Sequence, residues 1–188
     1  MNWPGVVPSR SRRVGSDQQH PDLSPLLLSM ADIYSAKGSD GEPLVRRALA
    51  IDEAALVPNH PNVAPDLVRL STWSLLHGKR ADTKDLLQRA LAMLKGAFGT
   101  DALLTAPALS SLGDLYLIEA KYEAAESLYQ QSMKSEEDAL GAEHPQVATS
   151  LRSLATLYCR KGKYAQAKKM LERSLALDQK GLWLCAIH

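Results

Sequence analysis

Three histidines of this sequence share one local context, because each is followed directly by a proline. They are His20, His60 and His144. Imidazole is a common zinc ligand, so a recurring His-Pro pair raises the question of a shared metal site. Ligand bonds to zinc are about 2 Å long, whereas equivalent points of stacked helices lie at least about 8 to 10 Å apart. The context therefore favours three loop residues in separate units, and we expect no metal ion or other cofactor.

Two further groups of residues could carry chemistry. Cys159 is followed by Arg160, and nearby positive charge promotes the thiolate form of a cysteine. The sequence pattern places no histidine and no second cysteine beside this thiol, so we expect it to be partly buried and inert. Glu136, Glu137 and Asp138 form an acidic run. Consecutive residues point to different sides of a helix, so we expect this run to be a solvated surface.

The common catalytic and nucleotide-binding motifs are missing from the sequence. None of the eleven glycines belongs to a GxxxxGKS/T or GxGxxG phosphate-binding loop, and neither HExxH nor GxSxG occurs. We therefore expect no catalytic residues and no enzymatic activity. The net charge of +1 provides no global field that would recruit nucleic acid or an anionic membrane.

Cysteine content and hydropathy bear on the compartment. The chain has two cysteines and no Asn-x-Ser/Thr sequon, which favours a reducing environment, and we expect a cytoplasmic protein. No apolar run approaches the length of about 20 residues that a membrane-spanning helix requires. Residues 1–16 contain three arginines and no acid, but Pro4 and Pro8 interrupt any amphipathic helix. We expect residues 1–19 to be a disordered leader.

The sequence repeats itself at an interval of 42 residues. Applied twice, this shift superposes the segments 60–63 and 144–147, which both begin with His-Pro, and the segment 102–105 is the copy between them. His20 begins a fourth copy that is two residues shorter, with the deletion after Gly38. A deletion is best tolerated where one helix turns into the next. The repeat therefore divides the chain into four units, residues 20–59, 60–101, 102–143 and 144–182.

Each unit predicts two helices joined by a tight turn. Apolar and small residues recur at spacings of three and four, which places them on one helical face. The first-helix pattern comprises Leu27, Met30, Ala31, Tyr34; Leu67, Leu70, Ser71, Ser74; Leu109, Leu112, Gly113, Tyr116; and Leu151, Leu154, Ala155, Tyr158. The second-helix pattern comprises Val45, Ala48, Leu49; Leu87, Ala90, Leu91; Tyr129, Ser132, Met133; and Leu171, Ser174, Leu175. The turn holds Gly38, Gly78, Ala120 and Gly162, where glycine can adopt the left-handed conformation that ends a helix.

The predicted helix boundaries follow from these patterns. We expect first helices at residues 24–37, 64–77, 105–119 and 147–160, and second helices at residues 43–56, 81–96, 122–140 and 164–180. A proline recurs near the start of three first helices, where its missing N–H costs no hydrogen bond. No strand is expected within residues 22–180, so the fold class is all-α.

The repeat resembles the tetratricopeptide repeat. The similarity rests on small residues at the helix crossing, a tyrosine one turn later, and the Gly-Lys-Tyr of residues 162–164. The interval of 42 residues and the segments 122–133 and 144–167 are similar to the long-repeat branch typified by kinesin light chains. The resemblance covers residues 20–182. It implies a right-handed α-solenoid of about four hairpins, whose first helices line a groove that binds a peptide or helix of another protein.

The helical pattern also places residues on the groove side of the first helices. For the second to fourth units they are Val68, Thr72, Leu76, Ser110, Asp114, Ile118, Arg152, Thr156 and Arg160. This family commonly has a pair of asparagines on the first helix. Ser110 and Ser111, and Arg152 and Ser153, occupy those positions here. The lysine and asparagine set of the carboxylate-clamping members is also missing, so the resemblance does not imply recognition of chaperone C-termini.

Charge is unevenly distributed between the last two units. Residues 102–143 contain eight acids and two bases, and residues 144–182 contain eight bases and two acids, which gives net charges of −6 and +6. One interpretation is that the two units neutralise each other through exposed ion pairs, worth about 0 to 1 kcal/mol each. The other is that Arg152 and Arg160 form a docking site for an acidic partner.

Residues 183–188 form an apolar tail after the last unit. Trp183 stands where Gly99 and Gly141 close earlier units. We expect the tail to fold back over the fourth unit as a cap, and its apolar residues make it a candidate surface for self-association. The favoured function is a scaffold for protein–protein interaction, without nucleic-acid or membrane binding. The alternatives are a structural or self-assembly module, or a fragment of a longer repeat protein.

Overall fold

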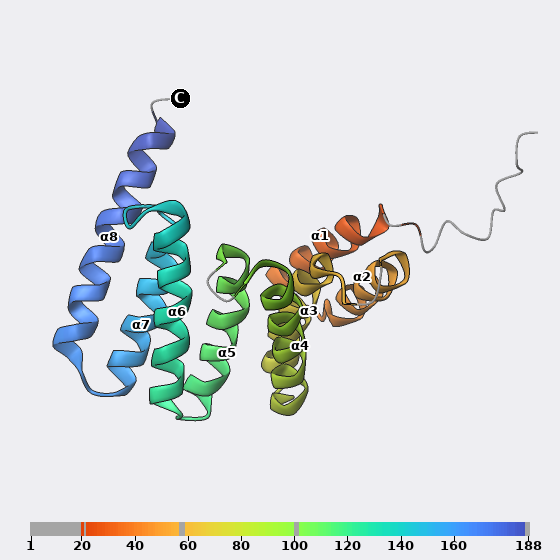
Figure 1. Ribbon diagram of the computed structural model, residues 1–188, viewed down its shortest axis with the longest axis horizontal. Coiled ribbons are helices and arrows are strands. Elements are labelled where there is room, and N and C mark those ends of the chain that lie inside the picture. The colour runs from red at the N-terminus through yellow and green to blue at the C-terminus, as the bar shows by residue number, and fades with distance from the viewer. Residues whose placement is uncertain (1–19, 21, 57–58, 100–101, 187–188) are drawn as a thin grey trace, which may run out of the picture.

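The chain folds as a row of antiparallel helical hairpins (Figure 1). This computed structural model describes residues 20, 22–56, 59–99 and 102–186, with side chains as far as residue 179. These residues form the helices α1 (Leu23–Ala36), α2 (Glu42–Ala55), α3 (Ala64–Leu76), α4 (Arg80–Phe98), α5 (Ala106–Ile118), α6 (Tyr122–Leu140), α7 (Val147–Arg160) and α8 (Tyr164–Ala186). The short 3-10 turns η2 (Pro61–Val63) and η3 (Leu103–Thr105) precede α3 and α5.

The all-α prediction is confirmed, and no strand occurs in the part of the chain just described. Seven helices begin and end within two residues of the predicted boundaries. Helices α1 and α2 form the first hairpin, and the pairs α3 and α4, α5 and α6, and α7 and α8 form the next three. Between hairpins, the second helix of one unit packs against the first helix of the next.

A left-handed residue closes the first helix of every unit, as the turn pattern predicts. Gly38, Gly78 and Gly162 have φ angles of 68°, 72° and 72°. Ala120 has φ of 56° at the same position, although its side chain disfavours that conformation. In each unit the N–H of the following residue donates to the carbonyl five residues earlier, as from Lys121 to Tyr116 over 2.8 Å. The turn is therefore a Schellman-type helix end.

The recurring histidines are helix-capping residues. The Nδ1 atom of His60 accepts a hydrogen bond from the backbone N–H of Asn62 at 3.2 Å. His144 accepts from Gln146 at 3.2 Å, and His20 accepts from Asp22 at 3.3 Å. This arrangement confirms that the histidines belong to the loops between units. Each imidazole satisfies an N–H group that would otherwise lack a partner at a helix start.

The C-terminal segment differs from its prediction. Helices α4 and α6 end at Gly99 and Gly141, whose φ angles are 89° and 92°. Trp183 occupies the corresponding position of α8, and the helix continues to Ala186 (Figure 1). Residues 183–186 do not fold back as the expected cap, because they continue α8. The predicted leader, residues 1–19, and the last two residues lie outside the described residues.

The core of each hairpin depends on a small residue where its two helices cross. Ala31, Ser71, Gly113 and Ala155 are all buried at this crossing. Gly113 lies directly against the ring of Tyr129, and a methyl group placed on Gly113 would be 2.7 Å from its Cε1 atom. The Tyr129 hydroxyl donates to Asp114 Oδ1 at 2.6 Å. The third unit thus combines a large aromatic residue on α6 with the smallest residue on α5.

The turn after α5 gives a first prediction. Replacing Ala120 with glycine relieves the left-handed strain and is expected to stabilise the protein by about 1 kcal/mol. The melting temperature, measured by circular dichroism during thermal unfolding, should then rise by about 2–4 °C. The matched control is Gly78→Ala, which places the strained residue in the second unit and should lower the melting temperature. Equal effects of the two substitutions would contradict this account.

The contact between Gly113 and Tyr129 gives a second prediction. Gly113→Ala should destabilise the protein by about 1–3 kcal/mol, because the added methyl overpacks the crossing. Combining Gly113→Ala with Tyr129→Leu places a small residue opposite a leucine. The second unit has this combination at the equivalent positions, Ser71 and Leu87. The double variant should therefore be more stable than additivity predicts in urea unfolding. Strictly additive losses would show that the two residues do not share this space.

Candidate functional site

The predicted groove residues lie on three successive first helices, α3, α5 and α7. Val68 and Ser110 are half-buried, whereas Thr72, Leu76, Asp114, Ile118, Arg152, Thr156 and Arg160 are exposed. Leu76 and Ile118 are the large apolar residues of this set that reach solvent. We call this face the first-helix face. Its role in binding a partner remains a prediction.

Two charged members of the first-helix face already have partners within the chain. Asp114 accepts the hydrogen bond of Tyr129 described above. Arg152 binds Asp178 of α8 through an Nη1 to Oδ2 contact of 2.8 Å and donates to Thr149 at 3.0 Å. Asp178 therefore neutralises much of the positive charge of Arg152, which was one of the two residues expected to bind an acidic partner. Arg160 is exposed at the end of α7 and is the stronger candidate of the two.

An apolar pocket lies between the second and third units, and the sequence pattern did not predict it. Its volume is about 550 Å³. The lining residues are Pro61, Asn62, Pro65, Val68, Arg69, Leu94, Phe98, Leu103, Leu104, Pro107 and Gln146. Val68 joins the pocket to the first-helix face, and Phe98 and Leu104 expose apolar surface at its rim. The signals in the sequence were the single phenylalanine and the prolines that share one register.

Ion pairs link the acidic third unit to the basic fourth unit. Lys161 Nζ lies 2.8 Å from Glu126 Oε2, and Arg173 Nη2 lies 2.6 Å from Glu137 Oε1. These contacts support the interpretation that the two units neutralise each other. Glu136 departs from its prediction as a solvated residue, because it is buried and accepts a hydrogen bond from Ser150 at 2.8 Å. Burial raises the pKa of the Glu136 carboxyl.

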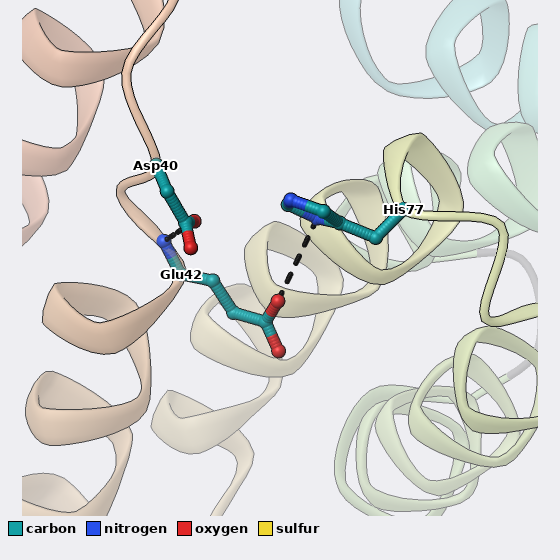
Figure 2. Close-up of side chains that lie close together, drawn as sticks. All are labelled: Asp40, Glu42 and His77. Atoms are coloured by element: carbon teal, nitrogen blue, oxygen red, sulfur yellow. Dashed lines mark hydrogen bonds and ion pairs between the residues drawn. The ribbon is translucent and has the colours of Figure 1, made fainter.

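Asp40, Glu42 and His77 form the one group of potential metal ligands found among the described residues (Figure 2). Glu42 begins α2 in the first unit, and Asp40 lies two residues before it. His77 directly follows the last residue of α3 in the second unit. Their ligand atoms lie within 4.8 Å of one another. His77 Nδ1 is 3.6 Å from Glu42 Oε2, and Asp40 Oδ1 accepts from the backbone N–H of Glu42 at 2.9 Å.

The central carboxylate of this group is already paired with two cations. Arg46 and Lys79 reach Glu42 Oε1 at 2.6 Å and 3.2 Å. Burial alone would raise the pKa of the Glu42 carboxyl, but its bonds to Arg46 and Lys79 outweigh burial and lower it. A divalent metal ion bound at Glu42 would either displace Arg46 and Lys79 or be repelled by their positive charges. We interpret the group as an ion-pair network that ties the first unit to the second.

A pair of carboxyl groups is enclosed between the first two units. Asp66 of α3 is buried, and its Oδ2 atom has no hydrogen-bond partner among the described residues. Asp52 of α2 faces Asp66 and accepts a hydrogen bond from Ser24 at 2.7 Å. Burial and the facing Asp52 carboxyl raise the pKa of Asp66 to about 7, against a smaller opposing effect of Arg69. The fold therefore favours a proton on Asp66.

Cys159 differs from its prediction. The thiol was expected to be partly buried, but the residue is exposed on α7. It lines a second hollow, of about 350 Å³, together with residues of α8.

Among the described residues, every helix is too short or too polar to form a membrane span.

Comparison with known proteins identifies the family. The sequence profile of the tetratricopeptide repeat family matches residues 78–138 and 104–180, which together span more than half of the chain. The chain belongs to the tetratricopeptide repeat family. Solved structures of kinesin-light-chain-like repeats share its fold, in line with the resemblance suggested by the interval of 42 residues. No curated protein matches the sequence.

Solved structures share the same fold at low sequence identity. One is a structure of nearly identical TPR-like repeats from a putative kinesin light chain of Podosopora anserina. It aligns with 89% of this chain over 80% of its own length, at 21% identity and a TM-score of 0.66. BtubC (BKLC) from P. vanneervenii aligns with 87% of this chain and 66% of that one, at 17% identity and a TM-score of 0.69. MamA aligns with 86% of this chain and 82% of that one, at 19% identity and a TM-score of 0.54.

The buried pair of aspartates gives a third prediction, on pH. A raised pKa in the folded state means that folding becomes less favourable as pH rises from about 4 to about 7, because unfolding then releases a proton. Each pKa unit corresponds to about 1.4 kcal/mol. Asp66→Asn should therefore stabilise the protein progressively as pH rises through this range. It should have little effect below about pH 4, where Asp66 is protonated in both states.

The measurement is the difference in unfolding free energy between Asp66→Asn and the parent in urea at a series of pH values. Taking the difference removes the contribution of other carboxyl groups, such as Glu42. Asp138→Asn is the matched control, since it makes the same chemical change at an exposed position. A stability difference that does not change with pH would show that Asp66 titrates normally.

Proposed function

We propose that this chain is a protein-interaction module that holds a segment of a partner protein along its first-helix face. The apolar pocket between the second and third units would anchor the partner. Tetratricopeptide repeats generally mediate protein–protein interactions. The observation that carries the proposal is that Phe98 and Leu104 expose apolar surface around a pocket that continues into Val68. Exposed apolar surface around a concavity is typical of a binding site.

The chemistry of the pocket specifies the anchoring group of the partner. Its walls are mostly proline, leucine and phenylalanine, so the best occupant is a large apolar side chain. Burial of such a side chain contributes about 1.5–3 kcal/mol. Asn62 and Gln146 at the edge offer polar contacts to the partner's backbone. Arg69 is already paired with Asp32 of α1, so it contributes less charge than its position suggests.

The rest of the first-helix face extends the site away from the pocket. Leu76 and Ile118 add exposed apolar contacts near the helix ends. Arg160 would favour an acidic residue at the far end of the partner segment. The proposed partner segment is therefore mainly apolar and carries acidic residues at one end. We assign no catalytic activity to the chain, and we propose that it acts in the cytoplasm without binding nucleic acid or membranes.

A fourth prediction tests the pocket directly with a display library of random peptides. Peptides selected on the parent chain should share a large apolar residue. Leu104→Asp should weaken their binding by at least about 30-fold, because it places a charge at the anchoring point. Fluorescence anisotropy with a selected, labelled peptide measures the change in Kd.

Leu26→Asp provides the matched control, since Leu26 is equally an exposed leucine but lies on α1, outside the pocket. It should leave peptide binding unchanged. Both variants should keep the helical circular dichroism of the parent, which excludes unfolding as the cause. Peptides that bind Leu104→Asp as tightly as the parent would place the interaction elsewhere.

A further inference from the structure

Interior units join through one recurring contact. At the joint between the third and fourth units, Ala125 and Tyr129 of α6 pack against Leu154 and Leu157 of α7 in one buried cluster. A second helix thus supplies a small residue and a large one, and the following first helix supplies two large apolar residues. The same positions recur at each earlier joint through the interval of the repeat.

The last unit exposes the large residues of the second-helix half of this contact, whereas the small residue, Ala167, is only 2% exposed. Ala167 and Leu171 of α8 correspond to Ala125 and Tyr129, and both line the hollow of about 350 Å³. Leu171 is 47% exposed, whereas its interior counterparts, Val45, Leu87 and Tyr129, are at most 1% exposed. Leu175 is 58% exposed, against 8% and 7% for Leu49 and Leu91. We call Ala167, Leu171, Leu175 and Tyr164 the last-end face.

The first unit presents the other half. Met30 and Ile33 of α1 correspond to Leu154 and Leu157 of α7. Met30 is 44% exposed and Ile33 is 54% exposed, whereas the counterparts of both residues in the three later units are at most 8% exposed. Leu26, on the same helix, is also exposed. We call Leu26, Met30 and Ile33 the first-end face.

We propose that the first-end face of one copy of this chain docks on the last-end face of a second copy, which continues the helical stack from molecule to molecule. Met30 and Ile33 would occupy the hollow beside Ala167 and Leu171, as Leu154 and Leu157 occupy the equivalent space at the interior joint. Charge favours this pairing, because residues 20–59 contain six acids and three bases, a net charge of −3, and the fourth unit carries +6. The contact is head-to-tail, so assembly is open-ended.

One pair of side chains limits the affinity of this contact. At the interior joint, Lys161 after α7 donates to Glu126 of α6 at 2.8 Å. The equivalent residues at the intermolecular joint are Lys37 after α1 and Lys168 of α8, which would repel each other, although Glu172 lies 3.6 Å from Lys168 and offsets part of this repulsion. We therefore expect weak association that depends on concentration. Lys37→Glu should replace the repulsion with an attraction and lower the Kd by about fivefold.

Two variants, each blocked at one end, test the geometry by sedimentation velocity. Ile33→Asp disables the first-end face, and Leu171→Asp disables the last-end face. Each variant alone should associate at least about 30-fold more weakly than the parent, since every joint then contains one damaged face. An equimolar mixture should form a dimer and nothing larger, because it has one intact face of each kind per pair. The parent should form a concentration-dependent series of larger species.

Several results would overturn the proposal. They are a parent chain that stays monomeric up to millimolar concentration, a mixture that forms no dimer, and an Ile33→Asp variant that associates like the parent. The last result would mean that two last-end faces pair with each other. Leu104→Asp is the control at the peptide pocket and should associate like the parent, so failure of self-association and failure of peptide binding are separable. Circular dichroism establishes that each variant is folded.

Discussion

The packing of one unit's second helix against the next unit's first helix is the contact on which this structure depends. A single hairpin has an apolar face that it cannot bury alone, so each unit is stable only against its neighbours. The small residue at each helix crossing makes this packing close, and Gly113 beside Tyr129 shows how tightly size is matched. Among the described residues, the two ends of the row are the places where this requirement is unmet.

Buried carboxyl groups are concentrated at the joints between units. Asp66 faces Asp52 at the first joint, Glu42 binds Lys79 there, and Glu136 accepts a hydrogen bond from Ser150 at the third. Each group costs solvation energy unless a partner or a proton compensates it. The joints therefore combine apolar packing with polar contacts of specific geometry, and we expect the coupling between neighbouring units to depend on pH.

Proteins at 17–21% identity share this helical arrangement, which shows that the fold tolerates wide variation in sequence. The surface is where this chain acquires its own properties. The pocket beside Val68, the exposed Leu76 and Ile118, and the pairing of Arg152 with Asp178 all concern side chains that the fold itself does not require. Family membership indicates protein binding in general, and the chemistry of these side chains restricts which partners fit.

The sequence alone determined the helices, turns and units, because these depend on local periodicity and backbone preferences. Gly38, Gly78 and Gly162 marked turns without reference to any distant residue. Tertiary structure decided which polar residues are buried or paired, as for Glu136 with Ser150 and Arg152 with Asp178, since these partners come from different helices. It also created the pocket, whose lining residues come from the second, third and fourth units. Periodicity assigns a residue to a helical face, but only packing establishes what covers that face.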